Sequence, residues 1–437
     1  MEDNRMYWEK ETETMPGDRL EELQLARLKK SVEKASASVF YGELFKKTGL
    51  DSNGIKSLED IRKIPLTTKD DLREHWPYGF LAVSKDELVR MHSSSGTTGR
   101  ATVIFHTLDD INEWTNIVAR SMYMTGMRRS DVFQNMMTYA LFTGGLGFHY
   151  GAEKLGALVI PIGAGNSKRQ IQLMQDFQTT AIHVIPSYAL HLSSVFEEVG
   201  VDPKRDTQLR IAFLGAEPHS EKTREKIEEF YGVKAYNSYG LSEMDGPGVA
   251  FECQYQNGMH IWEDNFIVEI IDPDTLEPVP DGEEGELVLT TLLRDGMPIL
   301  RYRTKDLTRI IPGPCECGRT HARIERIKGR TDDMLILKGV NIFPIQIEKK
   351  LMDVPGVGTN FLIILERKGF NDHMTVRVEV QKEFFSGDLK QLENLRRRIV
   401  EELKSDILIT PKVELVEPGS LPKSEGKAVR VIDNREE

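Results

Sequence analysis

The sequence predicts an α/β protein with a large N-terminal domain of mainly parallel βαβ sheets plus a small β subdomain, followed by a small α+β domain. Three observations predict it. Helix-like and strand-like segments alternate from Gln170 to Glu243, a strand-rich stretch follows Pro273, and a new α+β pattern starts beyond residue 330. Strict alternation indicates βαβ units whose parallel sheet is buried on both faces. We therefore expect a first domain over residues 1–330 and a second over 331–437.

The elements of the first domain follow from hydrophobic spacing. Apolar residues recur near every 3.6 positions from Arg19 to Phe45, which predicts an amphipathic helix packed on the core. The runs at 181–185 and 209–214 are strand-like, with helices expected around 188–199 and 220–231. Ligands of such sheets bind at loops that follow the strands. These loops are therefore the expected place of a binding site.

The later elements are shorter. Strands at 286–291 and 299–303, joined by a turn at Asp295-Gly296, predict the β subdomain. Beyond it, helices are expected at 344–352 and 388–403, with strands at 334–337, 360–366, 374–380 and 413–416. About a hundred residues suffice for a separate small domain, and its boundary is expected near Thr331-Asp332.

Length and charge exclude several classes of protein. At 437 residues the chain exceeds the ~250–300 at which single cores stop growing, so a multidomain enzyme fits. The net charge of −12 lacks the positive footprint that nucleic acids and anionic membranes require. No apolar run approaches the ~20 residues that span a bilayer, and the N-terminus is not signal-like. We expect a cytoplasmic protein whose partners are neither nucleic acid nor membrane.

The three cysteines suit a metal better than a disulfide framework. Cys253 and His260, together with Cys315 and Cys317, supply three thiols and one imidazole. This is the donor set of a closed tetrahedral Zn²⁺ site, which would be structural because no position is left open for substrate. Plain reduced thiols are the alternative.

The most specific segment is the Ser-, Thr- and Gly-rich stretch from Ser93 to Thr102. Hydroxyls and glycines at this density let backbone N–H groups and Oγ atoms approach phosphate oxygens closely. The stretch is not a Walker A loop, because the G-x-x-x-x-G-K-[ST] pattern is missing. A flexible linker is the alternative for this stretch taken alone.

Further motifs follow in a fixed order. They are Leu214-Gly-Ala-Glu-Pro218, Tyr236-Asn-Ser-Tyr-Gly-Leu-Ser-Glu243, Tyr302-Arg-Thr-Lys-Asp306, Gly329-Arg-Thr-Asp-Asp-Met334 and Leu421-Pro-Lys-Ser-Glu-Gly-Lys427. This order resembles the adenylate-forming superfamily of acyl-CoA synthetases, luciferases and peptide-synthetase adenylation domains. Tyr7-Trp8, the segment 23–28, the Tyr41 region and Gly339–Pro344 resemble its phenylacetate–CoA ligase branch specifically, and the resemblance covers essentially the whole chain.

The resemblance implies roles in ATP binding. Glu243 would ligate Mg²⁺ through a hard carboxylate oxygen, and Lys427 would supply positive charge for adenylation. The residues expected to bind ATP or AMP are Ser94, Ser95, Gly96, Thr97, Thr98, Gly99, Gly215, Ala216, Glu217, Asn237, Ser238, Tyr239, Gly240, Ser242, Asp306, Arg326 and Arg330. Where many relatives carry Lys, this chain has Thr102, which leaves open how the loop compensates phosphate charge.

The resemblance also implies sites for the acid and for coenzyme A. The acid pocket is expected to contain Tyr139, Phe142, Gly144, Gly145, Ile185 and Pro186. Aromatic walls beside glycines suit a flat ring but also occur in ordinary cores. Lys338, Gly339 and Val340 would line the path of CoA. Rotation of the C-terminal domain about Asp332 would exchange Lys427 for that loop after adenylation.

The function implied by the resemblance is ATP-dependent ligation of an aryl acid, phenylacetate first, to CoA through an acyl adenylate, giving AMP and pyrophosphate. ATP, Mg²⁺ and CoA are the expected cofactors and co-substrates, and a homodimer is expected. Two alternatives stay open: adenylylation with another acceptor, a deazaflavin cofactor or a carrier protein, and a non-catalytic nucleotide-binding homologue. A change of one methyl group in the pocket alters discrimination between two acids by only ~1–3 kcal/mol. The sequence therefore does not rank phenylacetate against other aryl acids.

Overall fold

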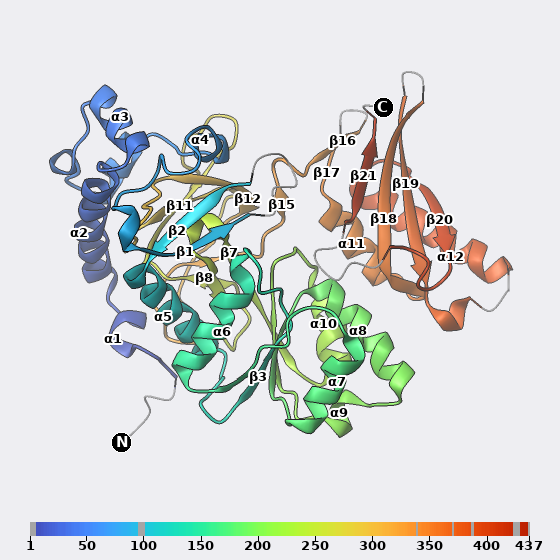
Figure 1. The fold of residues 1–437 in the computed structure, drawn as a ribbon. Coiled ribbons are helices and arrows are strands. Elements are labelled where there is room, and N and C mark those ends of the chain that lie inside the picture. The colour runs from blue at the N-terminus through green and yellow to red at the C-terminus, as the bar shows by residue number, and fades with distance from the viewer. Residues whose placement is uncertain are drawn as a thin grey trace. The chain divides into compact units, whose positions relative to one another are not determined.

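The computed structural model describes residues 6–94, 101–337, 340–368, 371–385, 389–422 and 429–435 (Figure 1). The chain divides into two compact units. The first comprises Met1–Gly163, Thr179–His183 and Tyr236–Arg326, and the second comprises Ala164–Gln178, Val184–Ala235 and Ile327–Glu437. The last segment of the second unit begins close to the expected boundary at residue 330, but this unit also contains two segments of the expected N-terminal domain.

The first unit starts with helices α1 (Lys10–Glu13), α2 (Gly17–Ala35) and α3 (Val39–Thr48). The single helix expected from Arg19 to Phe45 is therefore wrong. Helix α3 starts anew because the Ser38 side chain accepts a hydrogen bond from the Tyr41 N–H at 3.2 Å, the usual contact of an N-cap. Short helices follow at Ser52–Gly54 (η1), Leu58–Lys63 (η2), Lys69–Glu74 (α4) and Lys85–Glu87 (η3).

The sheets of the first unit are partly parallel and partly antiparallel. Strand β3 (Val132–Asn135) pairs in parallel with β4 (Leu158–Ile160) and with residues 181–183 of β5 (Ala181–Val184), which confirms the expected βαβ character. Strands β7 (Lys234–Leu241), β8 (Gly246–Glu252), β9 (Met259–Ile261), β14 (Arg323–Ile324) and β13 (Ile310–Ile311) pair antiparallel in that order. Helices α5 (Leu108–Met124) and α6 (Thr143–Leu155) lie side by side (Figure 1).

Two smaller groups of strands complete the first unit. Strands β1 (Leu88–Ser93) and β2 (Val103–Thr107) form an antiparallel pair on either side of the Ser/Gly-rich loop. The expected β subdomain consists of antiparallel β10 (Phe266–Ile271), β11 (Gly285–Thr291) and β12 (Tyr302–Thr308). The strand expected at 299–303 begins only at Tyr302, because Arg301 has a left-handed φ of 47° that interrupts the extended backbone.

The second unit contains α7 (Ser167–Asp176), α8 (Pro186–Val199), α9 (Pro203–Asp206), β6 (Ile211–Leu214) and α10 (Glu221–Tyr231). Its C-terminal part contains β15 (Gly329–Arg330), β16 (Leu335–Leu337), β17 (Val340–Ile342), α11 (Pro344–Asp353), β18 (Val357–Lys368), β19 (Asn371–Val380), η5 (Lys382–Phe384), α12 (Leu389–Ile407), β20 (Lys412–Val416) and β21 (Val431–Asn434). The strand order β20-β19-β18-β21 includes β21, which the sequence analysis missed.

An apolar core joins helices and sheet in this C-terminal part. Ile347 and Leu351 of α11 and Ile399 and Leu403 of α12 are fully buried against Ile363, Val376 and other inward residues of the sheet. These positions match the helix spacing that predicted both helices. No helix in the described part of the chain combines the length and apolar composition needed to cross a membrane.

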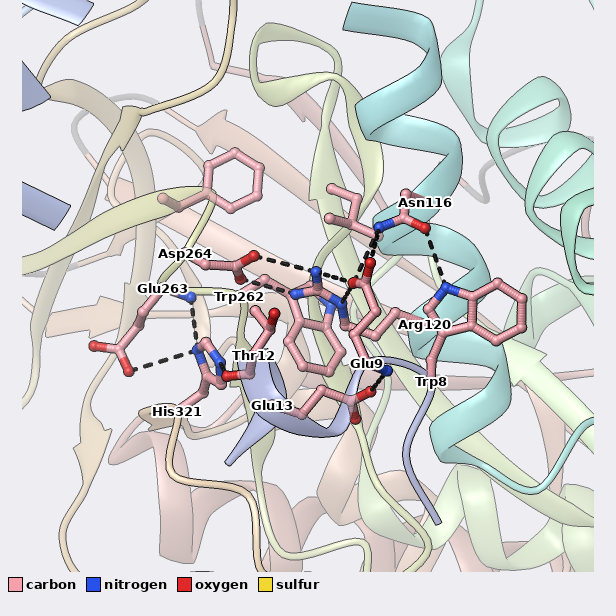
Figure 2. Close-up of polar contacts among 12 residues, drawn as sticks. Trp8, Glu9, Thr12, Glu13, Asn116, Arg120, Trp262, Glu263, Asp264 and His321 are labelled. Atoms are coloured by element: carbon pink, nitrogen blue, oxygen red, sulfur yellow. Dashed lines mark hydrogen bonds and ion pairs between the residues drawn. The ribbon is translucent and has the colours of Figure 1, made fainter. Parts of the chain in front are cut away.

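A buried charge cluster fastens the start of the chain to the first unit (Figure 2). The Arg120 guanidinium donates to both oxygens of Asp264, at 2.8 and 3.1 Å, and its Nε donates to Glu9 at 3.0 Å. Asn116 donates to Glu9 at 3.0 Å and accepts from the Trp8 indole at 3.1 Å. Because a buried guanidinium needs partners, these contacts hold the N-terminal segment on α5.

Removing one partner of this cluster should destabilise the protein. Asp264 is buried, so Asp264→Ala leaves Arg120 with Glu9 as its remaining carboxylate. Loss of one member of a buried pair costs about 3–5 kcal/mol of unfolding free energy, and urea denaturation measures it. The control is Asp274→Ala on the surface, expected within about 0.5 kcal/mol of wild type. A loss equal to that of the control would show that the cluster does not hold the fold.

Candidate functional site

The ends of the Ser/Gly-rich loop are joined at a neck formed by Ser94 and Thr102. The Ser94 N–H donates to the Thr102 carbonyl at 3.1 Å, and the Thr102 N–H donates to Ser94 Oγ at 3.1 Å. The two hydroxyl oxygens are 3.0 Å apart. The expected phosphate ligands Ser95, Gly96, Thr97, Thr98 and Gly99 lie outside the described residues. The neck therefore fixes where the loop begins and ends.

Glu243 lies next to this neck. It belongs to the short helix η4 (Ser242–Met244) and is buried, with 6% of its surface exposed. Thr102 Oγ1 lies 3.0 Å from Glu243 Oε1. Because a carboxylate oxygen accepts, the Thr102 hydroxyl donates to Glu243, and Ser94 Oγ is its second neighbour. A buried hard carboxylate beside two hydroxyls suits a Mg²⁺ ion.

The backbone before Glu243 requires a glycine. A Cβ on Gly240 would lie 1.9 Å from the Gly246 carbonyl oxygen, a distance that no side chain can occupy. The adjoining Ser242 hydroxyl lies 3.4 Å from Thr143 Oγ1 of α6, and the Trp114 indole of α5 donates to the Pro247 carbonyl at 2.9 Å. The segment 240–247 is thus closely packed against both helices.

Two further contacts bring together residues expected at the nucleotide. The Tyr239 hydroxyl donates to Asp306 Oδ2 at 2.6 Å, so the expected adenine-stacking ring lies beside the expected ribose acceptor. The Asn237 N–H donates to Glu252 at 2.8 Å, and Arg326 donates to the other Glu252 oxygen at 3.3 Å. Glu252 thus connects two expected residues, although the sequence analysis did not identify it. Ser238 is buried in the same strand.

The residues expected in the acid pocket start helix α6. Phe142 is the N-cap residue, and Gly144 and Gly145 are buried in the first turn. Asn135 donates to the Gly145 carbonyl at 2.7 Å and to the Tyr139 hydroxyl at 2.8 Å. Burial raises the pKa of Tyr139 to about 12, so the phenol is neutral, and its oxygen lies 3.2 Å from His149 Nδ1.

Several expected residues belong to the second unit and are described within it. Gly215, Ala216 and Glu217 follow strand β6, and Ala216 has a left-handed φ of 67°. Ile185 is the N-cap residue of α8 and Pro186 its first residue. Glu217 accepts a hydrogen bond from the Ser187 N–H. The expected pocket and adenine residues Pro186 and Glu217 line a common cavity of about 470 Å³.

The C-terminal part holds the remaining expected residues. Arg330 pairs with Asp332, the expected hinge, at 2.8 Å, and Val340 pairs with Leu337 across β16 and β17. Lys427, the expected adenylation lysine, lies outside the described residues, as do Lys338 and Gly339 of the expected CoA path.

The three cysteines and His260 form one buried cluster. All four donor atoms lie within 4.8 Å of one another. Cys253 Sγ and Cys315 Sγ are 3.7 Å apart, and His260 Nε2 is 3.3 Å from Cys317 Sγ. Zn–S bonds of about 2.3 Å at tetrahedral angles place neighbouring sulfurs about 3.8 Å apart. The cluster therefore has the donors and the size of a tetrahedral metal site.

The hydrogen bonds of the cluster also suit a metal. His260 Nδ1 lies 3.2 Å from the His321 carbonyl, to which it donates, so that Nε2 keeps its lone pair toward the sulfurs. A hydrogen bond with Cys253, and others with His260, lower the pKa of Cys317 toward the thiolate that binds metals. The Tyr7 hydroxyl donates to the Cys317 carbonyl at 2.9 Å, which ties the N-terminal segment to this loop.

Sequence reasoning missed the residues that support the site from behind. Thr102 was noted only because many relatives have Lys there, and its contact with Glu243 had no signal in the sequence. Arg294 donates to the Glu243 carbonyl from a distant loop, at 2.6 Å. Asn135 and Glu252 are the last residues of β3 and β8, and neither belongs to a motif.

Two family models match the chain. The model described as AMP-binding enzyme matches residues 21–291, and the model described as AMP-binding enzyme C-terminal domain matches residues 339–435. The chain is 44% identical to a phenylacetate-coenzyme A ligase of Thermus thermophilus, covering 98% of this chain and 100% of that one. It is 45% identical to a phenylacetate-coenzyme A ligase of Pseudomonas putida, covering 97% and 96%.

Solved structures agree with these matches. The structure is similar to 2-hydroxyisobutyryl-CoA ligase in the postadenylation state in complex with R3-HIB-AMP, with a TM-score of 0.94 and 32% identity. That similarity covers 100% of this chain and 94% of the other. The same enzyme with 2-HIB-AMP and CoA in its thioesterification state gives a TM-score of 0.74 at 33% identity and the same coverage.

Proposed function

The chain belongs to the phenylacetate–coenzyme A ligases of the AMP-binding enzyme family, and we propose that phenylacetate is the acid that it activates. Its reaction is ATP-dependent ligation of a carboxylic acid to CoA through an acyl adenylate, with release of AMP. The observation that carries the proposed substrate is the near-full-length similarity to enzymes of that name. The flat phenyl ring of phenylacetate suits the aromatic and glycine residues at the start of α6.

In the first step a carboxylate oxygen of the acid attacks the α-phosphorus of ATP, and pyrophosphate leaves. Ser94 and the loop after it hold the phosphates, Tyr239 stacks on the adenine and Asp306 accepts hydrogen bonds from the ribose. A bound Mg²⁺ would neutralise phosphate charge, and Glu243 is the carboxylate that would hold it. The Tyr239–Asp306 contact of 2.6 Å supports this assignment, because the ring proposed to stack on the adenine lies beside the carboxylate proposed for the ribose.

Lys427 is the proposed catalytic cation. Both reactants of the first step are anionic, so positive charge is needed where negative charge accumulates in the transition state. The ammonium group of a lysine is a compact charge with three donors, which suits contact with the carboxylate and the α-phosphate together.

In the second step the CoA thiolate attacks the acyl carbonyl, and AMP leaves with the electron pair of the broken bond. Lys338, Gly339 and Val340 are proposed to admit the pantetheine arm, and a change of backbone at Asp332 is proposed to bring this loop to the acyl adenylate. The Arg330–Asp332 ion pair at 2.8 Å supports Asp332 as a switch point, because rotation there would change the pair.

The substrate proposal is tested with purified protein, ATP, Mg²⁺, CoA and a panel of acids. Phenylacetate should give phenylacetyl-CoA, AMP and pyrophosphate with a higher kcat/KM than benzoate or indoleacetate, measured by mass spectrometry of the products. The reaction without CoA should stop at the adenylate. An acid other than phenylacetate at the top of the panel would replace it as substrate, and release of ADP would remove the adenylate mechanism.

The role of Lys427 separates the two half-reactions. Lys427→Ala should lower pyrophosphate exchange by about 10²–10³-fold, since it removes a charge that acts in the first transition state. CoA ester formation from supplied phenylacetyl-AMP should stay close to wild type. The control is Lys404→Ala, which removes an exposed lysine of α12 and should change neither rate. Normal exchange in Lys427→Ala would exclude the lysine from adenylation.

The cysteine cluster is proposed to hold one structural Zn²⁺. The native chain should contain about one zinc per molecule by mass spectrometry, and Cys315→Ser or His260→Asn should lose the metal and lower the Tm, because ligand bonds contribute to folding. The control is His373→Asn, which removes an exposed imidazole. Metal-free native protein, or a Cys315→Ser variant as stable as wild type, would leave the cluster as plain thiols.

A further inference from the structure

We propose that Arg294 and Thr102 are positioning residues that hold Glu243 from its two ends, Arg294 through the main chain and Thr102 through the carboxylate. The inference rests on the proposed role of Glu243 as the carboxylate that holds Mg²⁺. All three side chains belong to the first unit and are buried, with 2%, 0% and 6% of their surfaces exposed.

Arg294 reaches the main chain of the site. Its Nη1 donates to the Glu243 carbonyl at 2.6 Å, and its Nε lies 3.1 Å from Asp245 Oδ1. The Glu243 carbonyl belongs to the peptide bond between Glu243 and Met244. The hydrogen bond from the Arg294 guanidinium therefore fixes the orientation of that peptide within the turn. The guanidinium thus holds residue 243 through the backbone and residue 245 through the carboxylate.

Asp110 fixes the position of the loop that carries Arg294. Its carboxylate accepts from the Thr107 N–H at 2.8 Å at the start of α5, and also from the Asp295 and Gly296 N–H groups, at 2.6 and 3.0 Å. A Cβ on Gly296 would lie 2.8 Å from Asp110 Oδ2, so the turn needs a glycine for this approach. The loop after β11 is therefore bound to the first turn of α5.

Asp245 completes the support. It has a left-handed φ of 70°, an uncommon conformation for a residue other than glycine. His106 Nδ1 lies 3.4 Å from Asp245 Oδ1, and the His106 ring stacks on Trp114 at 5.8 Å. A buried ion pair contributes little net stability compared with apolar packing. The Arg294–Asp245 ion pair lies next to Glu243 in the chain, so we interpret it as a contact that positions Glu243.

Thr102 acts at the other end of Glu243. Its hydroxyl donates to Oε1 at 3.0 Å and lies 3.0 Å from Ser94 Oγ, so two neighbours restrict its rotation. No described residue donates a hydrogen bond to Oε2, and we assign that oxygen to the cation. Mg²⁺ requires near-ideal octahedral geometry with oxygens at about 2.0–2.1 Å. A carboxylate that could rotate would meet this requirement less often.

The threonine is tested by an isosteric exchange. Thr102→Val should weaken Mn²⁺ binding, measured by electron paramagnetic resonance with a non-hydrolysable ATP analogue, by about tenfold, the loss typical of one hydrogen bond to a charged group. Thr102→Ser should restore it. ATP binding in EDTA, measured by calorimetry, should stay unchanged. A loss of affinity for metal-free ATP would instead mean that Thr102 contacts the phosphates, which would overturn its positioning role.

The control for this variant is Thr179→Val. Thr179 is also buried in the first unit, and its hydroxyl donates to a side-chain oxygen, Gln134 Oε1, at 3.1 Å. The exchange therefore removes the same kind of contact away from Glu243, and Mn²⁺ binding should stay at the wild-type value. Equal weakening in both variants would overturn the proposal, because it would be a general consequence of lost stability.

The arginine is tested with Arg294→Met and Arg294→Lys. Methionine removes the donor to Glu243 and should weaken Mn²⁺ binding by about tenfold or more, whereas lysine keeps the charge and should restore part of it. The control is Arg120→Met, which removes an equally buried guanidinium with more partners. That control should lower the Tm yet leave Mn²⁺ binding unchanged. Should Arg294→Met fail to fold, Arg294→Lys and Thr102→Val still decide the matter.

Glu243→Gln distinguishes failure of this inference from failure of the proposed function. If Glu243→Gln weakens Mn²⁺ binding while Thr102→Val and Arg294→Met both match wild type, Glu243 holds the metal without these supports and the inference is wrong. If Glu243→Gln itself binds Mn²⁺ as wild type does, the metal role proposed for Glu243 is wrong and the inference falls with it. Weakening in all three supports both.

Discussion

A carboxylate removed from water must be matched by donors or by positive charge, and this constraint organises the first unit. Asp264 is matched by Arg120, Asp306 by the Tyr239 hydroxyl, and Glu243 by Thr102. In each case the partners come from segments far apart in the chain. The same contacts that satisfy the charges therefore bring the segments together, and folding and site assembly become one process.

The division of labour within the site follows from this constraint. Of the residues proposed to contact the nucleotide, Tyr239 and Asp306 lie in strands β7 and β12, whereas Glu243 lies in a short turn. Glu243 is in a short turn, yet its direction depends on Arg294, which Asp110 of α5 holds in place. A turn alone has little rigidity, so its precision comes from the helix behind it.

Much of the fold and of the site could be predicted, for reasons that differ by element. The helices at 344–353 and 389–407 have strong apolar periodicity, and the motifs around Glu243 and Asp306 carry the resemblance to the family. The break at Ser38, the late start of β12 and strand β21 depend on a cap, a left-handed residue and long-range pairing. Arg294 and Glu252 belong to no sequence motif, because their roles depend on contacts with residues that are distant in the chain.

The contact between Tyr7 and Cys317 has a consequence for synthesis on the ribosome. Its two residues are 310 positions apart, and Arg319 reaches back to Glu13 in the same way. At about 5–20 residues per second, Cys317 is made roughly 15–60 s after Tyr7. The contacts of Tyr7 and Glu13 with this loop therefore form late in synthesis, whereas those of Trp8 and Glu9 with α5 need only the chain up to Arg120.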